Sequence, residues 1–197
     1  MLTQLSTIKA RLALTVPDYD DLLTSAIKAV SARFDKETNR TLARTTTATH
    51  EFDADDTEIL PPSYPVESVT KFELKSNETD GWSEQTGVQY LIRRQCVISL
   101  SVPLSSPPST LNSPALARVT LTGGYVLPGD TPAAGQTALP DDLEQAAVEQ
   151  VAYWFRNRDK SGLIRSWPHD GTYEVFLQLD LLLEVRAVLK KYERFLL

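Results

Sequence analysis

The sequence predicts an α+β protein with a mainly helical core of four helices and an inserted antiparallel β region. Two observations lead to this prediction. Near both ends of the chain apolar residues recur at intervals of three and four, which is the period of an amphipathic helix. Over residues 43–126 β-branched residues are frequent and apolar residues alternate with polar ones, which is typical of strands. We expect all 197 residues to form a single domain.

The most strongly marked helix is expected over residues 139–162. Pro140 suits a first helical turn, because its missing N–H would have no partner there. Acidic residues follow it, where the helix dipole is positive, and basic residues precede Gly162 at the other end. The apolar stripe carries more apolar area than any other segment of similar length, so we expect the core to be built on it. Its members are Leu143, Ala147, Val151, Trp154 and Phe155.

Two further helices are predicted before the β region. The first covers residues 3–14 and is short. The second begins at Asp18, a good N-cap, and continues to about Arg40. Its helical stripe consists of Tyr19, Leu22, Leu23, Ala26, Ile27, Val30 and Phe34.

The inserted β region is expected to hold antiparallel strands joined by turns. Residues 77–87 are rich in turn formers, and the acidic run Asp53 to Asp56 is expected to join the first two strands. Residues 103–114 consist mostly of Ser and Pro, which indicates a solvent-exposed loop. The expected strands lie near residues 43–52, 57–60, 66–75, 88–92, 96–102 and 117–122, and the fourth and fifth are expected to pair.

The C-terminal helix, expected over residues 172–197, is apolar around more than half of its circumference, so it needs a partner surface. Packing on its own domain and docking onto a neighbouring subunit both remain open. Basic residues end this helix and the helix at 139–162. The helix dipole explains them most simply, and an acidic partner is the alternative. The candidate interface residues are Leu179, Leu182, Val185, Leu189, Lys190, Arg194, Arg156 and Arg158.

Composition limits the classes of function. The net charge of −6 argues against non-specific nucleic-acid binding, which needs a basic surface. The single cysteine, Cys96, makes a disulfide within the chain impossible and fits a reducing cytoplasm. The N-terminus lacks the apolar core of a signal peptide. No stretch of about 18 uninterrupted apolar residues predicts a membrane span.

No pattern of catalytic, cofactor-binding or metal-ligating residues is evident, so we expect neither an enzyme nor a cofactor. The two histidines, His50 and His169, have no Cys or His at metal-ligand spacing. His50 lies near Glu51 and Asp53, yet solvated surface charge explains these residues more simply than a divalent cation site. Cys96 alternates with apolar neighbours and is expected to be a buried small hydrophobe. Neither a P-loop nor a serine-hydrolase elbow occurs.

Four features, taken in order, resemble a known family. They are the helix from Asp18 that ends in Asn39-Arg40-Thr41-Leu42, the Pro65-Val66 entry to a long strand, the Gly124-Tyr125 step, and the helix that opens with Leu-Pro-Asp-Asp-Leu at Leu139. The chain resembles the head–tail connector proteins of tailed bacteriophages, which are small head-completion adaptors. No single motif is specific, and the order and spacing of the four carry the resemblance.

The resemblance implies a structural protein of the virion neck, made in the bacterial host cytoplasm and without catalytic activity. It would form a ring of about twelve subunits under the portal protein after DNA packaging and would dock the tail or a stopper protein. DNA would pass through the lumen without sequence-specific binding. The C-terminal helix would be a candidate portal contact, so that Leu182→Asp and Leu189→Asp would block assembly without unfolding the core. A cytoplasmic adaptor that binds one partner through this helix, without a ring, is the alternative. An enzyme of unrecognised type is a third possibility, which a deep pocket with convergent polar groups would favour.

Overall fold

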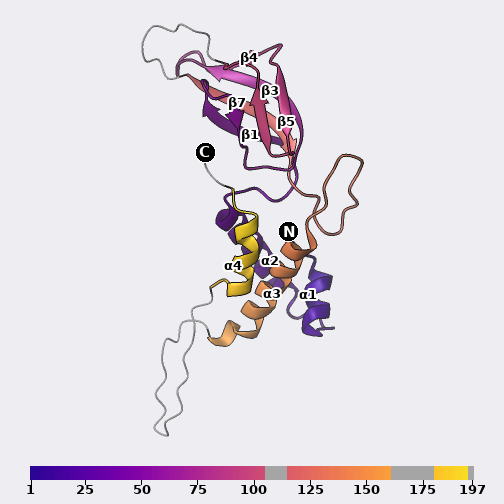
Figure 1. Ribbon diagram of the computed structural model, residues 1–197. Coiled ribbons are helices and arrows are strands. Elements are labelled where there is room, and N and C mark those ends of the chain that lie inside the picture. The colour runs from indigo at the N-terminus through magenta and orange to yellow at the C-terminus, as the bar shows by residue number, and fades with distance from the viewer. Residues whose placement is uncertain (105–114, 161–179, 195–197) are drawn as a thin grey trace. The chain divides into compact units, whose positions relative to one another are not determined.

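The computed structural model describes residues 1–104, 115–160 and 180–194 and divides the chain into two compact units (Figure 1). The helical unit comprises Met1–Thr38, Leu127–Asp130 and Leu139–Glu193. The β unit comprises Asn39–Val126, Thr131–Ala138 and Arg194–Leu197. The expectation of a single domain stays a prediction, because compactness does not show which parts fold on their own.

Within the helical unit, α3 packs against each of the other described α-helices. The unit is therefore built around α3, as Figure 1 also shows. The elements are α1 (Leu5–Leu12), α2 (Asp20–Thr38), α3 (Asp141–Arg156), the 3-10 helix η1 (Arg158–Lys160) and α4 (Leu183–Lys191).

The buried faces of these helices follow most of the apolar stripes of the sequence, but Leu22 of the predicted α2 stripe is 47% exposed. Burial of each large apolar side chain contributes roughly 1.5–3 kcal/mol to the free energy of unfolding. Trp154 and Phe155 are only partly buried, so the apolar stripe of α3 is not fully buried in the last turn of the helix. The fully or almost fully buried apolar residues include Leu23, Ile27, Val30 and Phe34 of α2, Leu143, Ala147 and Val151 of α3, and Val185 and Leu189 of α4.

All four described α-helices are shorter than the sequence-based expectations, and α1 covers Leu5–Leu12 where residues 3–14 were expected. α2 begins at Asp20, because Pro17 to Asp20 forms a turn in which the Asp20 N–H donates to the Pro17 carbonyl at 2.9 Å. α3 ends at Arg156, where the side-chain amide of Asn157 donates to the Tyr153 carbonyl at 2.9 Å and competes with the next helical turn.

α4 is shorter than the expected C-terminal helix of residues 172–197. Leu182 has extended backbone angles (φ −59°, ψ 148°), and the helix begins only at Leu183 and ends at Lys191. Residues 172–179 and 195–197 of that expectation lie outside the described residues.

The β unit contains two antiparallel sheets. The order of strands is β1-β7-β3-β4 in the first sheet and β2-β6-β5 in the second. The predicted pairing of residues 88–92 with 96–102 is confirmed, since Tyr90 lies opposite Leu100 and Arg93 opposite Val97. The strands are β1 (Thr45–Asp53), β2 (Glu58–Ile59), β3 (Val66–Lys75), β4 (Ser83–Gln85), β5 (Tyr90–Arg93), β6 (Val97–Leu100) and β7 (Leu116–Gly123).

Two features of the β unit were not predicted. The segment expected to hold only turns contains the edge strand β4, whose Ser83 and Gln85 pair with Leu74 and Phe72 of β3. The acidic run after Asp53 separates β1 and β2 into different sheets, because β1 pairs with β7 and β2 pairs with β6.

The fold is α+β, but the prediction of a mainly helical core is wrong, because two antiparallel sheets make up a unit as substantial as the helical one. The β unit has a hydrophobic core of its own, so the chain does not have a single helical core. The alternating apolar residues of β3, β6 and β7 face one another across the two sheets and exclude water. The core consists of Phe52, Ala54, Ile59, Val66, Phe72, Ile98, Leu100, Ala117, Val119 and Leu121.

Candidate interface groove of the helical unit

An open groove of about 370 Å³ lies along the helical unit between α3 and α4, and we call it the α3–α4 groove. Its surface is mainly apolar, and three carboxylates lie around it. A groove of this kind suits an apolar segment of another chain better than a polar small molecule. The lining residues are Asp142, Gln145, Ala146 and Glu149 on α3, and Leu182, Glu184, Val185 and Val188 on or next to α4.

The three carboxylates of the groove differ in their partners. Glu149 accepts three hydrogen bonds of 2.9–3.1 Å from the Arg11 guanidinium of α1. Asp142 accepts a hydrogen bond of 2.6 Å from the hydroxyl of Tyr192. Glu184 is exposed and has no ion-pair or hydrogen-bond partner among the described residues. The carboxylate of Glu184 is therefore the one most available to a basic group from another chain.

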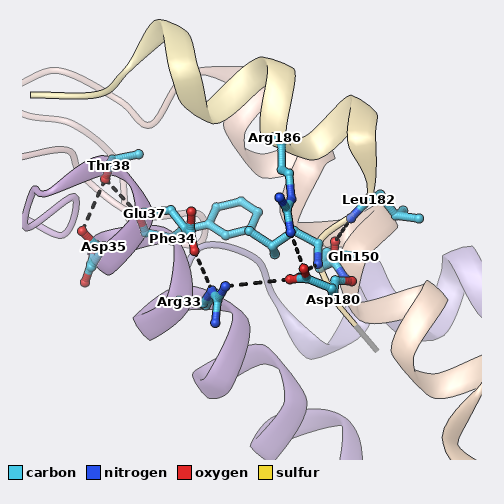
Figure 2. A network of polar contacts seen from close by, with 10 residues as sticks. Arg33, Phe34, Asp35, Glu37, Thr38, Gln150, Asp180, Leu182 and Arg186 are labelled. Carbon is cyan, nitrogen blue, oxygen red and sulfur yellow. Dashed lines mark hydrogen bonds and ion pairs between the residues drawn. The ribbon is translucent and has the colours of Figure 1, made fainter. Parts of the chain in front are cut away.

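A buried glutamine holds the start of α4 against α3. The side-chain nitrogen of Gln150 donates to the Asp180 carbonyl at 3.1 Å, and its side-chain oxygen accepts from the Leu182 N–H at 2.9 Å. Gln150 is fully buried, and Figure 2 shows it directed at the segment that leads into α4. These two bonds fix the end of the α3–α4 groove at which Leu182 lies.

Asp180 joins the same segment to two basic residues. Its carboxylate lies between Arg33 of α2, at 3.6 Å, and Arg186 of α4, as Figure 2 shows. A hydrogen bond from the Leu181 N–H, followed by the contacts with Arg186 and Arg33, holds the pKa of Asp180 below its ordinary value. Asp180 therefore stays charged near neutral pH and connects α2 with α4.

The C-terminal end of α3 presents basic side chains. Arg156 and Arg158 are both exposed, and Arg156 has no ion-pair partner among the described residues. The Arg158 guanidinium lies 4.4 Å from the ring centre of Phe155, which in turn packs edge-on against Tyr19 at 5.2 Å. This basic end is a second surface of the helical unit, separate from the groove.

The structure places the sequence-predicted interface residues in three different environments. Val185 and Leu189 face the interior of the helical unit and are 2% and 3% exposed. Leu182 is partly buried at the groove, Lys190 is exposed on α4, and Arg194 is partly buried. Leu179 lies outside the described residues. Assembly through these residues stays a prediction. The isolated subunit does not present Leu189 to a partner, and Val185 is accessible only at the floor of the α3–α4 groove.

Sequence reasoning missed Gln150 and Asp180. A signal for Gln150 did exist, because it lies three residues after Ala147 and seven after Leu143, within the apolar stripe of α3. A polar residue on a buried stripe requires a hydrogen-bond partner. The sequence could not show that the partner would be the backbone about thirty residues later.

The described residues that were considered for metal or thiol chemistry do not form a site, and His169 lies outside the described residues. Among the described residues no group of three or more His, Cys, Asp and Glu side chains is placed to hold a metal ion. Burial, together with the positive charge of Arg194, lowers the pKa of His50 to about 4. Cys96 is only partly buried and its thiol lies 3.7 Å from the Arg93 carbonyl, so the expectation of a fully buried cysteine is wrong. No described helix is long and apolar enough to cross a bilayer.

This chain matches the sequence profile of one protein family and shares its fold with several solved structures. The profile of a family described as head completion protein matches residues 1–194. No curated protein sequence matches this chain. A chain in the neck of an empty gene transfer agent particle with C6 symmetry has 15% identity and a TM-score of 0.57, over 98% of this chain and 90% of that one.

Two further structures share this fold. A chain in the virion of a native gene transfer agent particle has a TM-score of 0.56 and 15% identity, over 98% of this chain and 90% of that one. A chain in the neck of the native particle with C12 symmetry has a TM-score of 0.50 and 17% identity, over 89% and 84%. At these identities the likeness shows a common fold.

Proposed function

The chain belongs to the head completion protein family, whose members are structural proteins of the virion, and from this premise we propose that it is a ring-forming head–tail connector. The ring lies under the portal protein, at the junction of the head with the tail. It assembles after DNA packaging and provides the surface on which the tail or a stopper protein docks.

The observation that carries this proposal is the extent of the family match. Residues 1–194 include the helical unit and all described residues of the β unit, so the whole described chain follows the pattern of head completion proteins. The shared fold with neck chains of gene transfer agent particles supports the same location in a virion.

A ring accounts for the symmetry of the similar structures. The neck structures that share this fold have C6 and C12 symmetry. Cyclic symmetry requires that each subunit contact the next through two different surfaces. We therefore propose about twelve subunits, the copy number expected if the connector follows the portal.

The net negative charge of the chain suits a ring through which DNA passes without being bound. The net charge is −6, so a ring of these subunits repels the DNA backbone and does not retain it by non-specific binding. We propose that DNA passes through the ring without sequence-specific contacts, and that the protein acts through its interfaces and not through catalysis.

Electron microscopy of lysates from the parent phage with this gene disrupted tests the proposal. DNA-packed or leaked heads beside separate, complete tails are expected, with intact particles restored when the gene is supplied on a plasmid. Normal infectious particles in the disrupted phage would overturn the proposal. A soluble complex of one copy with one partner, without any ring, would favour the cytoplasmic adaptor instead.

A further inference from the structure

The α3–α4 groove has the chemistry of a docking site for an apolar and basic segment. Its floor includes Ala146 and Val185, and the carboxylates of Asp142, Glu149 and Glu184 lie around it. Glu184 has no partner among the residues that the structure describes, and its neighbour Leu183 is 80% exposed. An exposed leucine beside an unpaired carboxylate, next to an apolar groove, is typical of a surface that is covered on assembly.

The same chain carries a segment with the complementary character. Arg156 and Arg158 are exposed at the end of α3. The sequence then continues as Leu163-Ile164-Arg165-Ser166-Trp167, which adds three large apolar residues and a third arginine. We call residues 156–167 the basic segment. Arginine and tryptophan are the residue types most enriched at the energetically important centres of interfaces.

The groove and the basic segment lie at different positions along the helical unit. The groove extends along α3 from Asp142 to Glu149, and the basic segment begins at Arg156, about 10 Å further along the helix axis. Two different complementary patches, one along α3 and one beginning at its C-terminal end, favour contact between successive copies, since each copy then offers one patch to each neighbour. Such a head-to-tail contact gives a ring when the rotation between successive copies closes.

We propose that the basic segment of one copy docks in the α3–α4 groove of a second copy and forms the contact that repeats around the ring. This inference rests on the proposed connector function and deepens it by naming the subunit interface. The arginines pair with the carboxylates around the groove, while Leu163, Ile164 and Trp167 cover the apolar floor.

Charge reversal tests the pairing in the phage itself. The gene-disrupted phage is complemented with Glu184→Lys, with Arg156→Glu, or with both substitutions in one chain. Each single variant is expected to lower the titre of infectious particles at least about tenfold, since one lost interfacial ion pair of 1.4 kcal/mol corresponds to a factor of ten. The double variant is expected to recover most of that loss.

Asp130→Lys is the matched control, because Asp130 is an exposed acid of the helical unit that does not line the groove. It is expected to leave the titre unchanged. Circular dichroism of the purified variants shows that they are folded. A double variant that is as defective as the two single losses combined would overturn the proposed pairing.

Cross-linking between differently tagged copies tests the contact directly. Cys96 is replaced by Ser in all chains. One tagged copy then carries Gln145→Cys in the groove and the other carries Leu163→Cys in the basic segment. A short bismaleimide added to purified particles is expected to join the two tags. A third chain that carries both substitutions is treated in the same way. A cross-link within that chain, without any joining of the two tags, would overturn the inference, because the segment would then occupy its own groove. The absence of any cross-link in particles that contain the protein would also overturn it, and the groove would then belong to another partner.

The two levels of the proposal fail in different ways. If the protein is absent from purified particles, the connector function itself is wrong and the inference is lost with it. If the protein is present and the gene is required, but neither cross-linking nor charge reversal gives the expected result, only the proposed interface is wrong.

Discussion

The side-chain oxygen of Gln150 accepts a hydrogen bond from the backbone N–H of Leu182 at 2.9 Å, while its nitrogen donates to the Asp180 carbonyl at 3.1 Å. One buried amide thus satisfies two backbone groups of the segment that enters α4. Because Gln150 lies on the central helix α3, these bonds position α4 and one end of the α3–α4 groove.

Replacement of Gln150 by Leu should remove both bonds and leave the backbone groups of Asp180 and Leu182 without their partner. The expected cost is about 1–3 kcal/mol in the free energy of unfolding, the usual penalty for an unsatisfied, partly buried group. Urea denaturation followed by circular dichroism measures it. Gln145→Leu is the matched control on the same helix, because Gln145 is exposed, and it should change stability by less than about 0.5 kcal/mol. Equal effects of the two substitutions would contradict the anchoring role of Gln150.

Truncation to alanine should lower the stability of the protein much more at Leu189 of α4 than at Leu183 of the same helix. Leu189 is 3% exposed and Leu183 is 80% exposed. Leu189→Ala should cost about 2–5 kcal/mol in stability, since it leaves a cavity in the helical unit. Leu183→Ala should cost less than about 0.5 kcal/mol. Thermal unfolding of the purified variants checks both values, and a stable Leu189→Ala protein would show that α4 is not part of the core.

This burial changes the hypothesis that the sequence alone suggested for α4. Leu189→Asp is now expected to unfold the helical unit, because it places a charge in an apolar interior. It would therefore not distinguish an assembly defect from a folding defect. Leu183→Asp avoids this problem and reports on assembly alone.

The helices could be predicted because their signal is local. The stripe that contains Ile27 and Phe34, and the one that contains Val151, both face the interior as their spacing requires. Helix ends were less accurate, since they depend on single hydrogen bonds such as that of Asn157 to the Tyr153 carbonyl.

The organisation of the β unit could not be predicted because strand pairing joins distant residues. Nothing near β1 indicates that it pairs with β7, about seventy residues later in the sequence. The three-residue β4 has no apolar alternation, and only its place beside Phe72 and Leu74 of β3 makes it a strand. The prediction of a mainly helical core was wrong for the same reason, because sequence spacing could not assign Ile98 and Val119 to one shared core of the β unit.

The sequence indicated one of the two surfaces of the candidate interface. The basic end at Arg156 and Arg158 was singled out and both residues are exposed, while their role in an interface stays a prediction. The acidic groove was missed, since Glu149 and Glu184 are far apart in the sequence and come together only when α4 packs on α3.

Gly124 should tolerate alanine much less well than Gly81, although both have a positive φ. At Gly124, with φ +100°, an added Cβ would lie 2.6 Å from the Ala43 carbonyl oxygen. At Gly81, with φ +71°, nothing lies within 4 Å of that position. Gly81→Ala should cost about 1–2 kcal/mol from backbone strain alone. Gly124→Ala should cost about 1–3 kcal/mol more, because the backbone must also shift. Urea denaturation of both variants measures the difference, and equal losses would show that the close approach of Ala43 has no energetic consequence.

His50 should make the stability of the protein depend on pH between about 6.5 and about 4. Burial, and then the charge of Arg194, lowers the pKa of His50 from 6.5 to about 4 in the folded state. Between these values the unfolded chain binds a proton that the folded chain does not, so the contribution of His50 to stability is complete above pH 6.5 and is lost as the pH falls towards 4. In His50→Gln this contribution is absent, whereas the carboxylates titrate as before. The free energies of unfolding of the two proteins are measured in urea at intervals from pH 7.5 to 4.5. As the pH falls, the free energy of unfolding of the protein with His50 should decrease relative to that of the variant. A difference that stays constant across this range would show that His50 is as free to accept a proton in the folded protein as in the unfolded chain.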